Sequence, residues 1–450
     1  MKDGLLVLIG STLLLSGCAM TSGGAGDSAA EPAVAEVRAS EVPGSELIVA
    51  WNENLLSAAD AEDGFLTLKG LRTAAMMHSA IHDALSAVYG RYHPLVELAP
   101  APEADPVAAA AQAAFEVAVS QYPKSRSRWQ ADLDRWLAEV PGERARARGV
   151  ELGKTAAAAV VSSRQGDGWD GEAEYQWHPM GPGVYAEFNE HSGTPEGFIF
   201  GAGWAVAKPF VLESSEQFRA PPPPEIGTDA YTRAFEEVKD AGRYKSTVRT
   251  ADQTHLALWW KDFVERSHNR LARTLTEKES LDLVEAARLF ALLNLSIYDA
   301  YLDVFNNKFL YNHWRPYTAI RWAEHDGNPA TKADPEWNNT HRHTYAFPSY
   351  PSAHGTACAA AMTVMEEVFG PDYAFTMRTE EVDSAGPFSP KMKMDPPTRS
   401  FPSFAAAAAE CALSRIYLGI HFRYDSEEGT RLGEKVGGYI VHHALQKTGA

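Results

Sequence analysis

Apolar residues recur every three or four positions over most of the chain beyond residue 50, which is the spacing of one helix face. In the first half this spacing predicts helices at 64–89, 105–122, 127–140 and 142–163. In the second half it predicts helices at 231–241, 250–261, 277–306, 352–369, 402–417 and 426–446. The alternation typical of strands is scarce, so we expect an all-α fold.

Residues 165–228 lack this periodicity and are rich in Gly, Pro, Trp and Phe. Such a composition favours irregular structure. We therefore expect the junction of two helical bundles here, the first over residues 46–215 and the second over 216–450. A short internal repeat supports two related bundles, because Ile81-His-Asp-Ala and Ile297-Tyr-Asp-Ala are separated by 216 residues.

The chain begins with Met-Lys-Asp, an apolar run over residues 5–15 and the tetrapeptide Leu-Ser-Gly-Cys, which ends at Cys18. A short apolar run that ends in small residues is typical of an export signal. The tetrapeptide resembles a bacterial lipobox with Cys18 as the lipidated residue; an ordinary cleaved signal with an incidental cysteine is the alternative. We expect a signal peptide over residues 1–17 and a flexible tether over 18–45. The expected product is an exported bacterial lipoprotein, anchored to the membrane by its lipid alone and facing the periplasm or the cell exterior.

The 450-residue chain carries a formal net charge of −18. A protein this acidic is poorly suited to nucleic acid, so we expect no nucleic-acid partner. The sequence indicates no oligomeric state. Against this acidic background, the cations near residues 308 and 415 stand out.

Three short clusters in the second half combine cations, imidazoles, a hydroxyl and a carboxylate. They are Lys308 with Arg315-Pro316 after six intervening residues, Pro351-Ser352-Ala353-His354, and Ser414-Arg415 followed by His421 and Asp425. Ser352 is a suitable N-cap for the helix predicted after it, and first-turn N–H groups of a helix point toward a bound anion. Together these groups suit a tetrahedral oxyanion held by charge-assisted hydrogen bonds.

In order and spacing, the clusters resemble the signature of the superfamily that joins vanadium-dependent haloperoxidases and type 2 phosphatidic acid phosphatases. Its pattern is Lys-x6-Arg-Pro, then Pro-Ser-Gly-His, then Ser-Arg-x5-His-x3-Asp. The chain departs from the pattern at Ala353, which replaces the glycine, and in a slightly long interval between His354 and Ser414. Residues 50–52, 256–260 and 400–404 are similar to the bacterial haloperoxidase-like branch, which extends the resemblance over nearly all of residues 46–445.

The resemblance implies two helical bundles, of which the second carries a vanadate or phosphate site. The groups implied to bind the cofactor are Lys308, Arg315, Ser352, the backbone N–H of Ala353, Arg415 and His421. His421 would be the metal ligand, Asp425 would hold its other ring nitrogen, and Phe347 would lie beside the halide site. The implied catalytic residues are His354 as the acid–base group, His421, and Lys308, which would polarise bound peroxide.

The same pocket suits a haloperoxidase or a phosphatase, because vanadate and phosphate share a tetrahedral geometry. A vanadium-dependent haloperoxidase would use hydrogen peroxide to oxidise a halide to hypohalous acid. A phosphatase would instead cleave a phosphomonoester through a phosphohistidine at His421, without vanadate, and a non-catalytic anion-binding lipoprotein is the third alternative. The predicted extra bundle ahead of the site favours the haloperoxidase, since the phosphatases are mostly shorter and often membrane-spanning.

Four further residues receive structural interpretations. Cys358 and Cys411 are expected to lie near each other as two buried free thiols, with a disulfide, which export permits, as the alternative. His78 and His82 are one helical turn apart, but serine follows the first histidine where the zinc-protease pattern requires glutamate. We expect both in the core or on the surface rather than at a metal.

Gly429, Gly433 and Gly437 recur at four-residue spacing, which predicts a helix face that permits close packing. His341 and His343 fall in a polar loop and are assigned no role.

Overall fold

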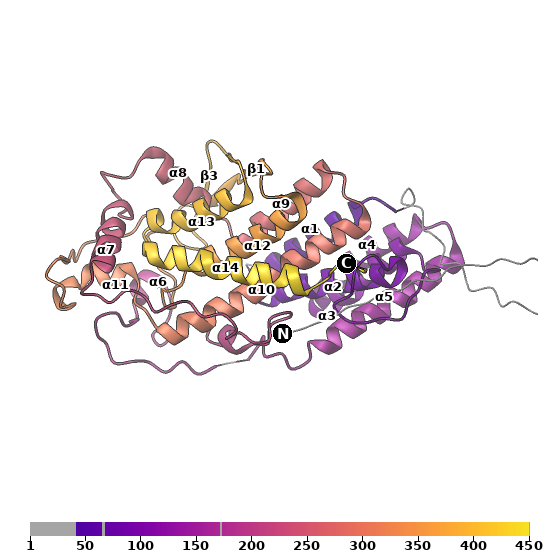
Figure 1. Cartoon of the computed structure of the whole chain (residues 1–450), viewed down its shortest axis with the longest axis horizontal. Helices are drawn as coiled ribbons and strands as arrows, with labels where there is room; N and C mark the ends of the chain where they lie inside the picture. Colours follow the sequence, from indigo (N-terminus) through magenta and orange to yellow (C-terminus); the bar gives the residue numbers. More distant parts are fainter. Residues whose placement is uncertain (1–41, 65–67, 172, 450) are drawn as a thin grey trace, which may run out of the picture. The chain divides into compact units, whose positions relative to one another are not determined.

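The computed structural model describes residues 42–64, 68–171 and 173–449, and Figure 1 shows their arrangement. The predicted signal peptide, Cys18 and most of the predicted tether lie outside these described residues. The helices of the first half are α1 (Glu46–Asp63), α2 (Leu68–Tyr89), α3 (Pro106–Gln121), α4 (Arg126–Ala138), α5 (Glu143–Ser163) and α6 (Asn189–Ser192). Those of the second half are α7 (Asp229–Ala241), α8 (Ala251–Trp259), α9 (Val264–Lys278), α10 (Leu283–Tyr311), α11 (Pro316–Arg321), α12 (Ala353–Phe369), α13 (Phe404–Leu418) and α14 (Arg423–His443). The predicted all-α fold is confirmed, and among the described residues no helix has the length and apolarity needed to cross a bilayer.

Helix α10 organises the packing. It starts at a capping box in which Asp282 accepts hydrogen bonds from the backbone of residues 284 and 285. It ends at Asn312, whose φ of 48° is a left-handed conformation that asparagine tolerates. Most of its side chains are buried, because α10 packs against α2 as well as against α12 and α14.

The helix predicted over 277–306 is wrong at its start. Helix α9 ends at Lys278, the chain turns at Ser280 with a φ of 52°, and α10 starts after its N-cap, Asp282. The apolar spacing continues through this turn, so periodicity alone did not reveal the break.

The internal repeat marks two equivalent buried carboxylates. Asp83 on α2 accepts hydrogen bonds from the backbone of residues 95 and 96 at 2.7 and 2.9 Å. Asp299 on α10 accepts them from residues 210–212 at 2.7 to 3.0 Å. Each carboxylate therefore anchors an irregular segment to its helix. Residues Val42–Ala450 cluster as one compact unit, and the bundle boundary between 215 and 216 stays a prediction.

Short strands, which the sequence pattern did not indicate, lie between α12 and α13. β1 (Phe375–Arg378) pairs with β4 (Thr398–Phe401), and β2 (Glu381–Asp383) pairs with β3 (Lys391–Lys393), both antiparallel. They occupy the long interval between the second and third clusters. Strands of three or four residues are too short for their alternation to be recognised in a sequence.

The expectation of two free thiols is wrong, because Cys358 on α12 and Cys411 on α13 form a disulfide. Their Cα atoms lie 6.8 Å apart, which is within the range that a bridge requires. Both helices are rich in alanine, and small side chains allow their backbones to approach this closely. The bridge joins the helices one turn from His354 and one turn from Arg415.

The glycine face of α14 packs against α12, as the four-residue spacing predicted. A Cβ atom at Gly429 would lie 2.6 Å from the carbonyl oxygen of Ser352, and one at Gly437 would lie 2.7 Å from that of Ala360. At Gly433, between them, a Cβ atom would come closer still to the backbone of α12. These glycines set the distance between α14 and the start of α12.

Gly433→Ala should destabilise the protein by about 1–3 kcal/mol, since the added methyl group overpacks the helix contact. Gly438→Ala is the matched control on the same helix, because a Cβ atom there would meet nothing within 4 Å. The control should be neutral or stabilise by up to about 1 kcal/mol through helix propensity. Urea unfolding followed by circular dichroism measures both variants, and equal midpoints would show that the glycine face does not set the helix distance.

Candidate active site

The three sequence clusters lie at helix ends that meet in one place. Lys308 is in the last turn of α10, Arg315 precedes α11, Ser352 precedes α12, Arg415 is in the last turn of α13, and Asp425 is in the first turn of α14. We use the name oxyanion cradle for the buried set Lys308, Arg315, Ser352, Ala353, Arg415 and His421.

Backbone carbonyl groups position two of the cradle's cations. Lys308 Nζ donates to the carbonyl oxygens of residues 348 and 349 at 2.9 and 2.7 Å. Arg315 donates through Nε to Phe347 at 2.8 Å and through Nη1 to Ile420 at 3.0 Å. Neutral carbonyl oxygens orient these side chains without cancelling their charge.

Several donors of the cradle have no partner among the described residues. They are Nη2 of Arg315 and both Nε and Nη2 of Arg415. Burial lowers the pKa of each guanidinium to about 10. Burial, and then the charge of Arg315, lowers the pKa of Lys308 well below its usual value. Because buried cations without a counter-charge are costly, this donor set fits an oxyanion.

The start of α12 adds backbone donors to this set. The Ser352 hydroxyl accepts a hydrogen bond from the N–H of Gly355 at 3.3 Å, as an N-cap does. The N–H of Ser352 donates to the Asp425 carbonyl oxygen at 2.9 Å, which ties α12 to α14. Ala353 has helical backbone geometry, so alanine in place of glycine leaves the N–H groups of the first helical turn available to an anion.

His421 is held in one orientation by a carboxylate. Its Nδ1 lies 2.9 Å from Oδ2 of Asp425, and the Ser349 hydroxyl donates to the same oxygen. This pairing puts the ring proton on Nδ1 and leaves the lone pair on Nε2, which lies 3.2 Å from Nη1 of Arg315. Burial, followed by the charges of Arg315 and Lys308, lowers the pKa of His421 well below its usual value. A neutral imidazole whose Nε2 carries the lone pair has the chemistry of a metal ligand or a nucleophile.

Sequence reasoning missed Ser349, because a single serine in a proline-rich loop has no spacing signal. Burial raises the pKa of Asp425, while the Ser349 hydrogen bond and the charge of Lys308 act in the opposite direction. Ser349 therefore helps to keep the carboxylate ionised.

His354 is half-buried on the first turn of α12 and is oriented by a different group. Its ring makes a hydrogen bond with the backbone of Trp260, and its Nε2 has no partner among the described residues. The bonded nitrogen is thus Nδ1, and Nε2 is the free base. Burial, and then the charge of Arg415, lowers the pKa of His354 well below its usual value. The role of Trp260 was also missed, because the two residues are 94 positions apart.

The ring of Phe347 lies against the cations, 4.6 Å from Cζ of Arg315 and 5.1 Å from Nζ of Lys308. His78 and His82 are buried on α2, where His78 contacts Asn52 at 3.0 Å. Over the described part of the chain, no group of three or more His, Cys, Asp or Glu side chains could hold a metal ion. The core interpretation of these two histidines agrees with their burial.

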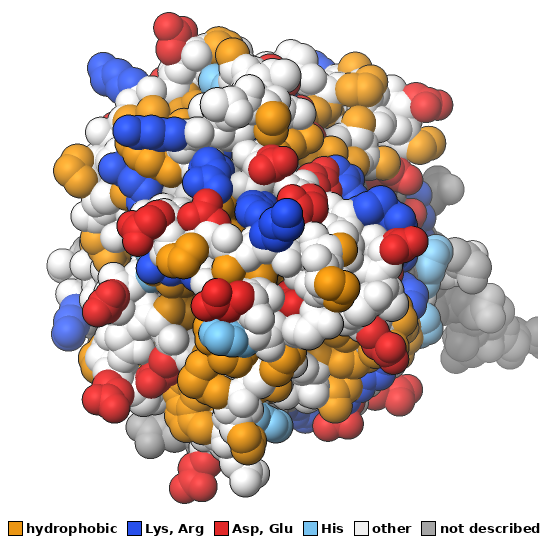
Figure 2. Space-filling view, turned by 90° about the vertical axis from the view of Figure 1, so that its left-hand side faces the viewer, with side chains coloured by type: hydrophobic (Ala, Val, Ile, Leu, Met, Phe, Trp, Pro, Cys, Tyr) orange, Lys and Arg blue, Asp and Glu red, His pale blue; other side chains and the backbone are white. Residues whose placement is uncertain are grey.

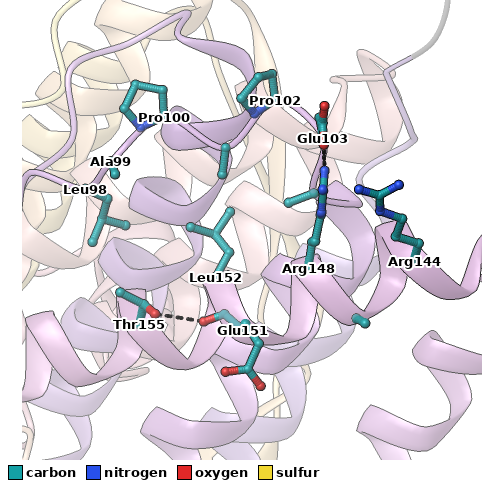
Figure 3. A pocket seen from close by; sticks show the side chains of 13 residues that line it. Leu98, Ala99, Pro100, Pro102, Glu103, Arg144, Arg148, Glu151, Leu152 and Thr155 are labelled. Carbon is teal, nitrogen blue, oxygen red and sulfur yellow. Dashed lines mark hydrogen bonds and ion pairs between the residues drawn. The ribbon is translucent and has the colours of Figure 1, made fainter.

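Surface features do not mark the cradle. Figure 2 shows that acidic and basic side chains are interspersed over the end that carries α7 and α11, since the cradle's cations are buried. A groove of about 780 Å³ lies instead between residues 98–104 and α5 (Figure 3). Leu98, Pro100 and Leu152 line it, and no cradle residue does.

Comparisons with known proteins agree with this geometry. Residues 288–449 match the family model described as the VCPO second helical-bundle domain. Vanadium chloroperoxidase of Curvularia inaequalis is 28% identical over 281 residues, which are 49% of this chain and 45% of that protein. This chain is thus similar to vanadium haloperoxidases. The matched part spans less than half of the length of that curated relative.

Solved structures of the family share the fold. A bacterial vanadium-dependent iodoperoxidase superposes with a TM-score of 0.70 at 23% identity, covering 90% of this chain and 98% of that one. A holo-type bacterial vanadium-dependent chloroperoxidase superposes with a TM-score of 0.66 at 17% identity, covering 89% and 98%. The fold therefore extends over both predicted bundles, well beyond the region matched by the family model.

Arg415→Met should lower the affinity for inorganic vanadate more than tenfold, because each charge-assisted hydrogen bond contributes about 1.5–3 kcal/mol. Arg423→Met is the matched control, since the Arg423 guanidinium pairs with Glu237. Isothermal titration calorimetry should give the control a dissociation constant within twofold of the unchanged protein. Far-UV circular dichroism should be the same for all three proteins, and unchanged vanadate binding by Arg415→Met would remove Arg415 from the cradle.

Proposed function

We propose that this protein is a vanadium-dependent haloperoxidase, which uses hydrogen peroxide to oxidise a halide to hypohalous acid. The observation that carries the proposal is the set of unpartnered donors on Arg315 and Arg415 next to His421, whose Nδ1 is held by Asp425. The names of the relatives, a chloroperoxidase and an iodoperoxidase among them, support the same chemistry.

Vanadate fits the donor set of the cradle. Lys308, Arg315, Arg415, Ser352 and the N–H of Ala353 would hold its oxygens, and Nε2 of His421 would be the protein's ligand to the metal. When bound, vanadate supplies a Lewis acid that activates hydrogen peroxide. The hydrogen bond from Nδ1 to Asp425 makes His421 a stronger ligand, because the carboxylate raises the basicity of the ring.

His354 moves the protons of the reaction. Its free Nε2 takes a proton as hydrogen peroxide binds and returns it to the oxygen that leaves as water. The halide gives two electrons to the peroxide O–O bond, so that peroxide, halide and one proton yield hypohalous acid and water. The Lys308 ammonium lies 5.1 Å from the ring of Phe347. In this reaction the ammonium stabilises negative charge on the peroxide oxygen, and the ring offers an apolar side to the halide.

The phosphatase alternative, with a phosphomonoester substrate and a phosphohistidine at His421, is not favoured. The relatives described above are haloperoxidases, and the first-half helices α1–α5 belong to the same compact unit as the site.

His354→Ala and His421→Ala should fail in different ways. The first should bind vanadate but lose about 10²–10⁴ in turnover, because it removes acid–base help. The second should lose tight vanadate binding, because it removes the metal ligand. Halide oxidation assays and vanadate calorimetry on both variants test the assignment, and the reverse pattern would exchange the two roles.

We also propose that Cys18 anchors the exported protein to the membrane through a lipid. The support is the Leu-Ser-Gly-Cys tetrapeptide after the apolar run of residues 5–15. Cys18→Ser should move the protein from the membrane fraction to the soluble fraction in cells. Continued membrane association of this variant after a high-salt wash would contradict the anchor.

A further inference from the structure

The disulfide between Cys358 and Cys411 lies directly beside the candidate active site. Cys358 follows His354 by four residues on α12. Cys411 precedes Arg415 by four residues on α13. One helical turn advances about 5.4 Å along its axis, so each sulfur atom lies about one turn from a residue of the proposed chemistry.

Both cysteines are fully buried, with 0% of the surface of each residue exposed. Thiol–disulfide exchange requires a thiolate to attack a sulfur atom directly. A larger thiol or an oxidoreductase therefore has no direct approach to these sulfur atoms in the folded protein. A small oxidant that forms inside the protein meets a much lower steric barrier.

A histidine side chain contacts the sulfur of Cys358. Nε2 of His268, a buried residue of α9, lies 3.3 Å from Sγ of Cys358. The other ring nitrogen, Nδ1, lies 3.0 Å from the carbonyl oxygen of Val264. A carbonyl oxygen only accepts hydrogen bonds, so Nδ1 carries the ring proton and Nε2 carries the lone pair.

This lone pair has a donor only when Cys358 is a thiol. Over the described part of the chain, Sγ of Cys358 is the one partner of Nε2 of His268. A disulfide sulfur carries no hydrogen, whereas a thiol S–H donates weakly to an acceptor. Burial lowers the pKa of His268 to about 3, so the ring is neutral and Nε2 has no proton to donate. Because a buried acceptor without a donor is costly, the surroundings of Cys358 fit its reduced state.

Trp260 contacts both His354 and His268. Its backbone makes a hydrogen bond with the His354 ring, and its indole ring lies 6.3 Å from the His268 ring, centroid to centroid. The side chains between α12 and α13 are small here, since a Cβ atom at Gly355 would lie 3.6 Å from that of Ala412. The proton-transfer residue and the disulfide therefore border one continuous region of the core.

We propose that the enzyme closes this disulfide with its own product, hypohalous acid, after the chain has folded with both thiols reduced. This inference rests on the proposed haloperoxidase function. The Cys358 sulfur forms a bond to halogen while the halogen–oxygen bond of hypohalous acid breaks. The thiol proton, held between Sγ and Nε2 of His268, joins the departing hydroxide as water.

The second cysteine completes the bridge. The Cys411 sulfur attacks the Cys358 sulfur, the sulfur–halogen bond breaks, and halide leaves with the Cys411 proton. Hypohalous acid and two thiols thus give one disulfide, water, halide and a proton. The two sulfur atoms together lose two electrons, and the halogen gains them. The first turnover thereby joins α12 to α13 beside the cradle.

The test starts from Cys18→Ser protein, whose remaining cysteines are Cys358 and Cys411. This protein is unfolded, reduced and refolded under argon, so that both cysteines are thiols. One equivalent of peroxide, with vanadate, bromide and excess methionine, should then close the bridge in most chains. Methionine consumes hypobromous acid that reaches the solution, so closure must occur inside the protein. Without bromide, at least tenfold fewer chains should close, as counted by thiol titration after denaturation.

His268→Gln tests the contact with Cys358, and His325→Gln is the matched control, because the His325 side chain is 54% exposed. In the same assay, at least fivefold fewer chains of His268→Gln should close, whereas the control should stay within twofold of the unchanged histidine. Triiodide formation by bridged protein should stay within twofold in both variants, because neither histidine belongs to the oxyanion cradle.

Equal closure without bromide would overturn the proposal, because peroxide would then be the oxidant. Closure abolished by methionine would overturn it as well, because hypobromous acid would then act from solution. Reduced protein that does not fold would have the same consequence, since the bridge would have to form before the site exists. Bridged protein that forms no triiodide would instead refute the proposed function. Triiodide formation by bridged protein, together with thiols that persist in the reduced protein, would refute this inference alone.

Discussion

Burial of three cations around one imidazole is the constraint on which the rest of this structure depends. Lys308, Arg315 and Arg415 are removed from water, and neutral backbone carbonyl oxygens position the first two of them. Desolvating a charge in this way costs several kcal/mol unless an opposite charge replaces the lost water. Asp425 supplies part of that charge. An oxyanion would supply the rest, so these buried donors lower the stability of the free protein and a bound ligand would restore it.

The fold holds the buried cations together by fixing the ends of helices α12, α13 and α14 relative to one another. The glycine face of α14 brings its first turn, with Asp425, against the start of α12. The bridge between Cys358 and Cys411 joins α12 to α13 one turn from His354 and Arg415. Side chains from separate helices thereby share one site, with little freedom for the distances between them to change.

His421 belongs to the cradle and His354 lies at the start of α12 beside it. The hydrogen-bond partners of the two rings give them different properties. His421 pairs through Nδ1 with a carboxylate, which strengthens the ring as a ligand and keeps its lone pair on Nε2. His354 pairs with the Trp260 backbone, a weaker partner that fixes the tautomer and leaves Nε2 available for proton transfer. In the proposed function, the difference between a carboxylate and a carbonyl oxygen would distinguish the metal ligand from the acid–base residue.

The sequence by itself determined the helical class, the close approach at Gly433 and the composition of the oxyanion cradle. The first two depend on residues spaced within a few helical turns, where local geometry dictates which groups share a helix face. The cradle was predicted from the resemblance of three separate clusters to a family signature. Only the tertiary structure decided that Ser349 supports Asp425, that Trp260 orients His354 and that Cys358 and Cys411 are bridged. These features join segments that are tens of residues apart, and no local periodicity records a contact whose distance is set by the packing of other helices.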